Sequence, residues 1–137
     1  MTRKCLQFCP FGYFADNNTF SCVTNCSSLY PYADSLTHKC VNYSSCSQGQ
    51  FAYLATGTNS GGLCKAICPP NYFSNPLNKK CETGCPSGYY ASTINQTCAQ
   101  TCSVNLYMDS VNKKCVPSCP SANNLFGDPF TRQCVTV

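Results

Sequence analysis

The residues of this chain whose types and spacing could do chemistry are its cysteines, of which the 137 residues contain 15. Cysteine thiols at short regular intervals either pair as disulfides or hold a metal ion such as Zn²⁺. Most of the cysteines follow the pattern Cys-x₃-Cys. The exceptions are one wider pair, Cys40-x₅-Cys46, and a final single cysteine, Cys134. The regular pairs are Cys5/Cys9, Cys22/Cys26, Cys64/Cys68, Cys81/Cys85, Cys98/Cys102 and Cys115/Cys119.

Disulfides are favoured over a metal site. An x₃ spacing is less typical of zinc ligands than x₂, and the only histidine is His38. The chain also carries Asn-x-Ser/Thr sequons for N-linked glycans, which belong to the oxidising secretory route. We therefore predict no metal or other cofactor, and N-linked glycans at the four sequon asparagines, Asn17, Asn25, Asn42 and Asn95.

Spacing also favours one pairing, although sequence alone leaves others open. The two cysteines within a Cys-x₃-Cys pair could bond only by closing a very tight ring. Joining the second cysteine of each pair to the first of the next closes loops worth roughly 3 kcal/mol each, or about 20 kcal/mol in total. That sum exceeds the net stability of an ordinary domain, so the disulfides should hold the fold. The pairs predicted are Cys9–Cys22, Cys26–Cys40, Cys46–Cys64, Cys68–Cys81, Cys85–Cys98, Cys102–Cys115 and Cys119–Cys134.

Cys5 has no partner in this scheme. It occupies the position that would close a preceding repeat, so the chain is expected to be a segment of a longer protein with the partner upstream. An intermolecular disulfide, or a free thiol or other pairing, remains open.

The stretches between cysteines must position the half-cystines, and each predicts a short β-hairpin. Aromatic residues stand four and five positions after the second cysteine, as Tyr72 and Phe73 do after Cys68. A turn rich in Asn, Asp and Ser follows, and then a polar arm. Neighbouring residues of a strand point to opposite faces, so one ring can cover the cystine while the other packs on the adjacent repeat.

The predicted fold class is therefore small and disulfide-rich: a linear array of about seven short β-hairpin repeats, each closed by one disulfide, stacked into a rod. Residues 1–137 form a single array, with units at about 5–22, 22–40, 40–64, 64–81, 81–98, 98–115 and 115–134.

The third unit departs from the pattern, because the loop between Gln50 and Leu63 is the longest and ends in a Gly-rich stretch, 57–62. It is either a contact site for a partner or a tolerated insertion.

Two lysine pairs, Lys79-Lys80 and Lys113-Lys114, occupy equivalent repeat positions. They could attract acidic glycans or nucleic acid, but we expect them to solubilise an exposed hairpin arm. No nucleic-acid motif is present.

No catalytic constellation is visible, so we expect the protein not to be an enzyme and predict no catalytic residue. The five acidic residues sit mostly where Asp initiates a turn: Asp16, Asp34, Glu82, Asp109 and Asp128. We expect His38 to be an exposed hairpin residue.

The repeats resemble growth-factor-receptor, or furin-like, cysteine-rich repeats, as in ciliate-type protist cysteine-rich surface or secreted proteins. Cys81-x₃-Cys85-Pro-Ser-Gly-Tyr-Tyr-Ala91 and the Cys22-Val23-x₂-Cys26 pair carry the resemblance, which extends from Cys5 to Cys134. It implies hairpins closed by single disulfides and no catalytic residues.

Together these features lead us to expect an extracellular or cell-surface structural glycoprotein that self-associates into a coat or filament. The alternative is a ligand-binding or adhesion stalk of a receptor-like protein. The sequence contains no apolar run of 18 residues that would indicate a membrane segment.

Overall fold

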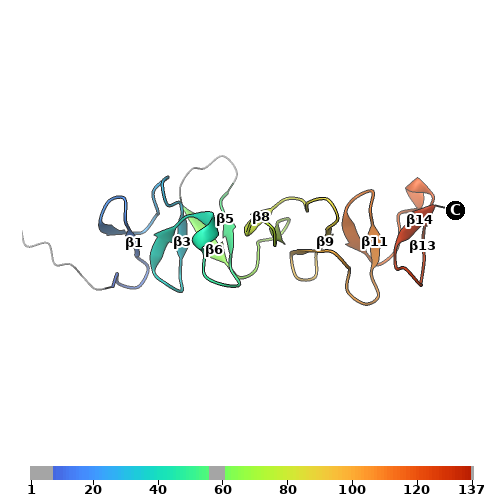
Figure 1. Ribbon diagram of the computed structural model, residues 1–137, viewed down its shortest axis with the longest axis horizontal. Helices are drawn as coiled ribbons and strands as arrows, with labels where there is room; N and C mark the ends of the chain where they lie inside the picture. The colour runs from blue at the N-terminus through green and yellow to red at the C-terminus, as the bar shows by residue number, and fades with distance from the viewer. Residues whose placement is uncertain (1–7, 56–60, 137) are drawn as a thin grey trace, which may run out of the picture. The chain divides into compact units, whose positions relative to one another are not determined.

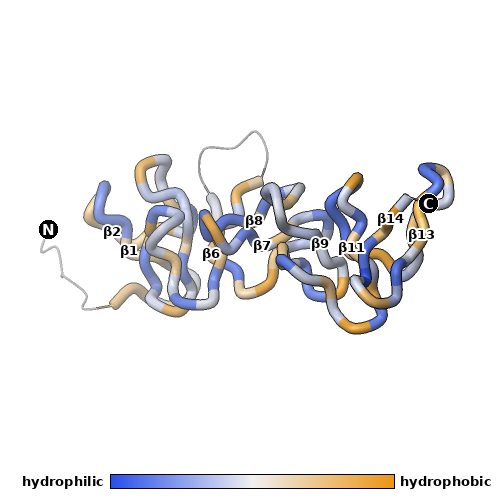
Figure 2. The backbone as a smooth tube through the Cα atoms, turned by 45° about the vertical axis from the view of Figure 1, so that its right-hand side comes forward, coloured by the Kyte–Doolittle hydropathy of each residue, from blue (hydrophilic) through white to orange (hydrophobic). Residues whose placement is uncertain are grey.

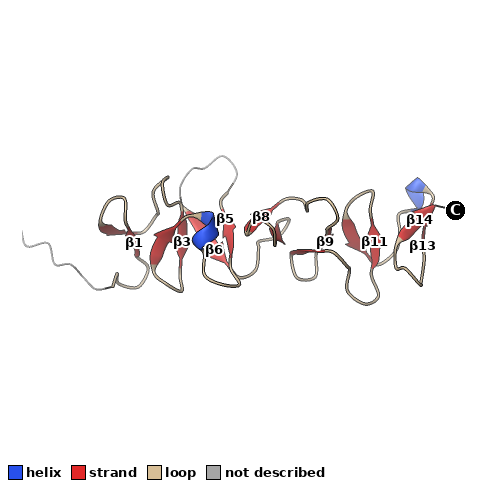
Figure 3. Cartoon of the chain, in the orientation of Figure 1, coloured by secondary structure: helices blue, strands red, loops and turns tan. Residues whose placement is uncertain are grey.

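The computed structural model describes residues 8–55 and 61–136. Its regular structure consists of 14 strands of three or four residues and two single-turn 3₁₀ helices (Figures 1 and 3). In order they are β1 (Phe14–Asp16), β2 (Ser21–Val23), β3 (Tyr32–Asp34), β4 (Lys39–Val41), η1 (Tyr43–Ser45), β5 (Phe51–Tyr53), β6 (Gly62–Lys65), β7 (Phe73–Asn75), β8 (Lys80–Glu82), β9 (Tyr90–Ser92), β10 (Thr97–Ala99), β11 (Tyr107–Asp109), β12 (Lys114–Val116), η2 (Ser121–Asn123), β13 (Leu125–Gly127) and β14 (Cys134–Thr136).

The chain forms two compact units. Of the described residues, the first comprises 8–55, 61–66 and 78–81, and the second comprises 67–77 and 82–136. Within the first unit the hairpins β1–β2, β3–β4 and β5–β6 lie side by side, and β8 borders β5. Within the second unit β7 borders the β9–β10 hairpin, β9 borders β11–β12, and the hairpin β13–β14 forms a separate sheet.

Five hairpins repeat one register. The middle residue of the first strand lies opposite a half-cystine of the second strand, as Ala33 does to Cys40 and Ala91 to Cys98. In β13–β14 the half-cystine Cys134 lies opposite Gly127, the last residue of β13. The turn between the strands usually ends in a residue with φ between 53° and 58°, in the left-handed region: Phe20, His38, Lys79, Gln96, Lys113 and Arg132.

This left-handed turn residue links neighbouring hairpins, because its carbonyl faces outward. The His38 carbonyl accepts a hydrogen bond from the Ala15 N–H at 2.9 Å, and the Lys113 carbonyl accepts one from the Ala91 N–H at the same distance. The second strand of one hairpin thereby runs parallel to the first strand of the hairpin before it. A left-handed conformation at a non-glycine residue is unfavourable, and here the turn and the inter-hairpin bond stabilise it.

The core is divided into small clusters, each around one cystine. Phe14, in the first hairpin, packs on the buried group formed by Cys26, Cys40 and Ala33 in the second. Tyr30, two residues before Tyr32 in the chain, packs on that same group from within its own repeat.

The same arrangement recurs in the second unit. Phe73 packs with Ala91 and the Cys85–Cys98 cystine, which Tyr89 also contacts. In these repeats one apolar side chain covers the repeat's own disulfide and another covers the disulfide of the next repeat. Tyr89 and Tyr90, which are adjacent in sequence, divide these two roles as the alternation of strand residues predicts.

The predicted disulfide ladder is confirmed. Six bridges have Cα–Cα separations of 5.5 to 5.6 Å, within the range that a disulfide requires. Cys68 and Cys81 are disulfide-bonded as well, which makes seven disulfides between consecutive cysteines of the series. The small disulfide-rich hairpin-repeat fold is thus the one expected, and hairpins stack within each unit. The proposed roles of Cys5 concern a residue outside the described ranges.

Candidate functional site

The sequon asparagines are the residues for which sequence analysis predicted a modification, and all four are exposed. Asn17 and Asn95 lie in hairpin turns, Asn25 precedes the buried Cys26, and Asn42 precedes η1. Their side chains are therefore on the surface, where a bulky glycan can be accommodated.

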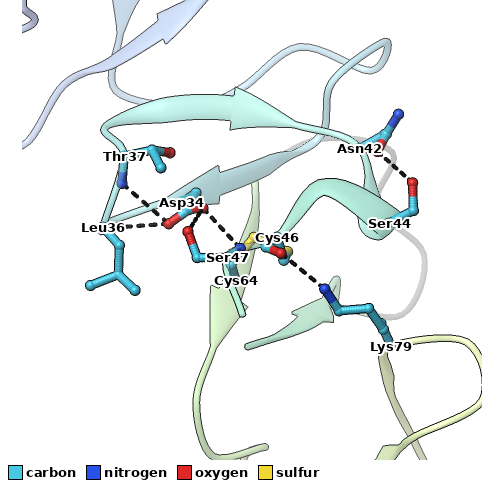
Figure 4. Close-up of a disulfide and its surroundings, with 9 residues drawn as sticks. All are labelled: Asp34, Leu36, Thr37, Asn42, Ser44, Cys46, Ser47, Cys64 and Lys79. Atoms are coloured by element: carbon cyan, nitrogen blue, oxygen red, sulfur yellow. Dashed lines mark hydrogen bonds between the residues drawn. A yellow bond between two sulfur atoms is a disulfide. The ribbon is translucent and has the colours of Figure 1, made fainter. Parts of the chain in front are cut away.

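Two sequons share a local geometry. The Thr97 hydroxyl donates to the Asn95 Oδ1 at 2.6 Å, and the Ser44 hydroxyl donates to the Asn42 Oδ1 at 2.9 Å. Figure 4 shows the Asn42 nitrogen, the atom to which a sugar would be attached, pointing away from Ser44. At Asn17 the sequon hydroxyl, that of Thr19, is instead hydrogen-bonded to Ser21.

A second set of polar residues, one at the end of the first strand in most hairpins, is buried rather than exposed. Its members are Asp16, Asp34, Asn75, Ser92 and Asp109. In Asp34 the Oδ1 accepts the turn N–H of Leu36 at 2.9 Å, and Asp16, Asn75, Asp109 and the more exposed Asp128 cap their turns in the same way. The prediction that Asp initiates these turns is confirmed, and the burial of the carboxyl group is an additional finding.

Asp34 also joins two repeats. Its Oδ2 accepts hydrogen bonds from the Ser47 hydroxyl at 2.6 Å and from the Ser47 N–H at 3.1 Å, next to the Cys46–Cys64 disulfide (Figure 4). Burial alone would raise the pKa of the Asp34 carboxyl. The hydrogen bonds from Ser47, and those from the Leu36 and Thr37 backbone, outweigh burial and lower that pKa below its ordinary value.

Asp16 and Ser27 occupy the equivalent positions one repeat earlier, since Ser27 follows Cys26 as Ser47 follows Cys46. The Asp16 Oδ2 and the Ser27 hydroxyl are both buried and have no hydrogen-bond partner among the described residues. Spacing within the repeat could have identified both Asp–Ser pairs. Sequence analysis did not, because it considered the aspartates only as turn residues.

The two lysine pairs differ. Lys79 donates from Nζ to the Cys46 carbonyl at 3.0 Å, and the Lys80 ammonium lies 4.3 Å from the centre of the Tyr43 ring. Both are half-buried, so the expectation of an exposed solubilising arm is wrong for this pair. Lys113 and Lys114 are exposed, as expected.

His38 is also not the exposed residue that we expected. Its ring stacks against that of Phe14, with 6.4 Å between their centres and 23° between their planes. Its Nδ1 is buried without a partner among the described residues. The physical reason is its left-handed turn position, which directs its carbonyl to Ala15 and brings the ring against the preceding hairpin.

The turns carry a further regular feature that sequence analysis missed. Two residues after the polar residue that ends the first strand, most hairpins place an exposed apolar side chain, and Figure 2 shows hydrophobic segments at several of these turns. The five side chains, 61 to 95% exposed, are Leu36, Leu77, Ile94, Val111 and Phe130. The period of the repeat is the signal that would have found them.

Comparison with known proteins adds no identification: no family model and no curated protein matches this sequence. Over residues 8–55 and 61–136 we find no grouping of three or more His, Cys, Asp or Glu side chains suited to hold a metal ion. The same ranges include no helix of the length and apolarity needed to cross a membrane.

Proposed function

We propose that this protein is an extracellular structural glycoprotein whose disulfide-closed repeats assemble into a surface coat or filament. The main support is that the hairpins are closed by their own disulfides and that, at four of these disulfides, an aromatic side chain of the preceding hairpin packs on the cystine. Such a design needs no single large core, and it can be extended repeat by repeat.

The chemical setting supports the location. Seven disulfides form and persist in an oxidising compartment, and four exposed sequons are compatible with glycan attachment on the secretory route. The resemblance to furin-like cysteine-rich repeats belongs to the same proposal, because hairpins closed by single disulfides are the module type that it implies.

The mechanism is mechanical. Covalent closure of loops with sequence separations of 13 to 18 residues restricts the unfolded chain, which resists both unfolding and proteolysis. The exposed apolar turn residues offer contact points for neighbouring molecules.

Electron microscopy of the secreted, glycosylated protein after size-exclusion chromatography tests this proposal. Ordered fibres or sheets are the expected result, and they should persist after enzymatic removal of the glycans. Dispersed monomers that capture a soluble ligand would contradict it and would indicate the adhesion stalk instead.

A further inference from the structure

The four sequons differ in where the fold places the hydroxyl group that completes them. An Asn-x-Ser/Thr sequence accepts an N-linked glycan only when its third residue supplies a hydroxyl, so the transferring enzyme must reach this group as well as the asparagine. The hydroxyls of Thr19, Ser44 and Thr97 take part in hydrogen bonds at the surface, as Figure 4 shows for Ser44. The Ser27 hydroxyl, which completes the Asn25 sequon, is buried and has no hydrogen-bond partner among the described residues.

The burial of Ser27 comes with the half-cystine that it follows. Cys26 is 2% exposed and bonded to Cys40, and Phe14 of the preceding hairpin packs on this cystine. Ser27 occupies the repeat position of Ser47, whose hydroxyl donates to the carboxylate of the preceding repeat. The enclosure of the Ser27 hydroxyl therefore depends on the disulfide beside it.

The backbone of the Asn25 sequon is held as well. The Cys26 carbonyl accepts a hydrogen bond from the Gly61 N–H at 3.4 Å, within the first unit. Gly61 also lies near the sequon asparagine, since a Cβ on Gly61 would stand 3.9 Å from the Asn25 Oδ1. The closed hairpin thus fixes the middle residue of the sequon by its sulfur and by its carbonyl. An enzyme cannot draw this segment into its own site without breaking those contacts.

The Asn25 side chain itself is exposed. The folded protein can therefore accommodate a glycan already attached to Asn25, although its buried Ser27 hydroxyl is out of reach of the enzyme that attaches one. The order of two reactions decides the outcome at this asparagine: transfer of the glycan, and closure of the Cys26–Cys40 disulfide.

We propose that Asn25 receives its glycan only while the Cys26–Cys40 disulfide is open, so that oxidation of this hairpin closes the modification site. In the transfer, the bond between the sugar C1 and the pyrophosphate of a lipid-linked oligosaccharide breaks, and a C1–N bond forms at the Asn25 Nδ2. The amide loses one proton, and the lipid pyrophosphate leaves. In the competing reaction, the two thiols give two electrons and two protons to the disulfide of a thiol oxidoreductase, which becomes a dithiol. Because both reactions belong to the secretory route, the inference rests on the proposed function.

The Asn95 sequon provides the matched comparison. Thr97 adjoins the half-cystine Cys98 in sequence, so its hydroxyl also lies next to a disulfide. The Thr97 hydroxyl nevertheless lies at the surface and donates to the Asn95 Oδ1. Glycan occupancy at Asn95 should therefore not depend on the Cys85–Cys98 disulfide.

Mass spectrometry of peptides tests the inference by measuring glycan occupancy at each sequon, with the full chain expressed through the secretory route of a eukaryotic cell. Enzymatic release of the glycans in heavy-oxygen water marks every asparagine that carried one. The variant Cys40→Ala keeps the disulfide open and leaves all three residues of the Asn25 sequon in place. Its matched control, Cys85→Ala, opens the disulfide next to the Asn95 sequon. Protein from the cells and from the medium is measured, so a variant that is not secreted still reports its occupancy.

In the parent we expect Asn25 to be occupied in a smaller share of molecules than Asn95. Cys40→Ala should raise the occupancy of Asn25 to that of Asn95, whereas Cys85→Ala should leave the occupancy of Asn95 unchanged. A reducing agent that enters the cells during synthesis should raise the occupancy of Asn25 in the parent in the same way, which shows the effect without a mutation.

Three results overturn the inference, and they are distinguishable. If other sequons are glycosylated and Asn25 is occupied no more in Cys40→Ala than in the parent, the disulfide does not control the site and the proposed glycoprotein stands. If Cys85→Ala changes Asn95 as much as Cys40→Ala changes Asn25, disulfide closure acts on sequons in general and not through the buried Ser27 hydroxyl. If none of the four sequons carries a glycan in the secreted parent, the glycoprotein part of the proposed function fails, and the modification site with it.

Discussion

Replacement of Asp34 by alanine tests the hydrogen-bonded contact between two successive repeats. The carboxylate is fully buried, and it accepts hydrogen bonds from its own turn and from Ser47 of the following repeat. Truncation leaves the Ser47 N–H without its acceptor. We therefore predict that Asp34→Ala loosens the connection at Ser47 and the turn at Leu36 while the Cys26–Cys40 and Cys46–Cys64 disulfides remain closed.

The magnitude follows from the bonds that are lost. A hydrogen bond to a charged group contributes about 1.5–3 kcal/mol, so opening at the Ser47 amide should become easier by about 2 kcal/mol. Because each 1.4 kcal/mol corresponds to about a tenfold change, the Ser47 amide should exchange its hydrogen about 30 times faster. Hydrogen exchange followed residue by residue by NMR measures this directly.

Two further variants separate the roles of the two carboxylate oxygens. Asp34→Asn keeps an acceptor for the Leu36 N–H but places an amide group where Ser47 needs an acceptor, so exchange should increase at Ser47 and stay nearly unchanged at Leu36. Asp128→Ala removes a turn cap whose side-chain hydrogen bonds, among the residues that the structure describes, stay within its own turn, so its effect should be confined to Phe130 and Thr131. Unchanged exchange of the Ser47 amide in Asp34→Ala would refute the reasoning.

The same carboxylate predicts a pH dependence. Its pKa is lower in the folded protein than in the unfolded chain, so its stabilisation is fully present above the unfolded value of about 3.9. The stabilisation is lost as the pH falls through the lower folded pKa. Protection of the Ser47 amide should therefore fall below about pH 4 in the parent, and Asp34→Asn should remove this dependence.

Two other predictions concern packing between repeats. Gly62→Ala should destabilise the first unit by about 1–3 kcal/mol in denaturant unfolding, because a Cβ there would lie 2.7 Å from the Tyr32 ring. The control is Gly84→Ala, whose Cβ would meet nothing within 4 Å, and it should unfold like the parent. Phe73→Ala should hasten reduction of Cys85–Cys98 by a limiting thiol, since Phe73 packs on this cystine. Mass spectrometry of trapped thiols measures that rate, and an unchanged rate of reduction of Cys85–Cys98 would show that Phe73 does not protect this cystine.

The features that could be predicted from sequence are those repeated along the chain. The intervals between cysteines predicted the disulfide pairs, and the aromatic residues after each second cysteine predicted strands that cover one disulfide from within the repeat and the next from outside. These predictions depend only on local geometry, namely the period of a strand and the length of a loop that a disulfide can close.

The features that could not be predicted depend on neighbours in another repeat. Lys79 and Lys113 occupy the same position in their repeats. Lys79 donates to the Cys46 carbonyl of another repeat, whereas the Lys113 side chain is exposed. His38 was expected to be exposed, but its turn brings the ring against Phe14. Asp34 likewise has a second hydrogen-bonding partner, Ser47, which lies in the next repeat and is distant in sequence from its turn.

The central claim is that disulfides closing successive hairpins hold this fold. Complete reduction in non-denaturing buffer, followed by amide NMR and hydrogen exchange, tests it most directly. We predict that the dispersed spectrum collapses to that of an unfolded chain, with exchange protection lost in every hairpin. Retention of the dispersed spectrum by protein whose thiols are all shown to be reduced would contradict the account.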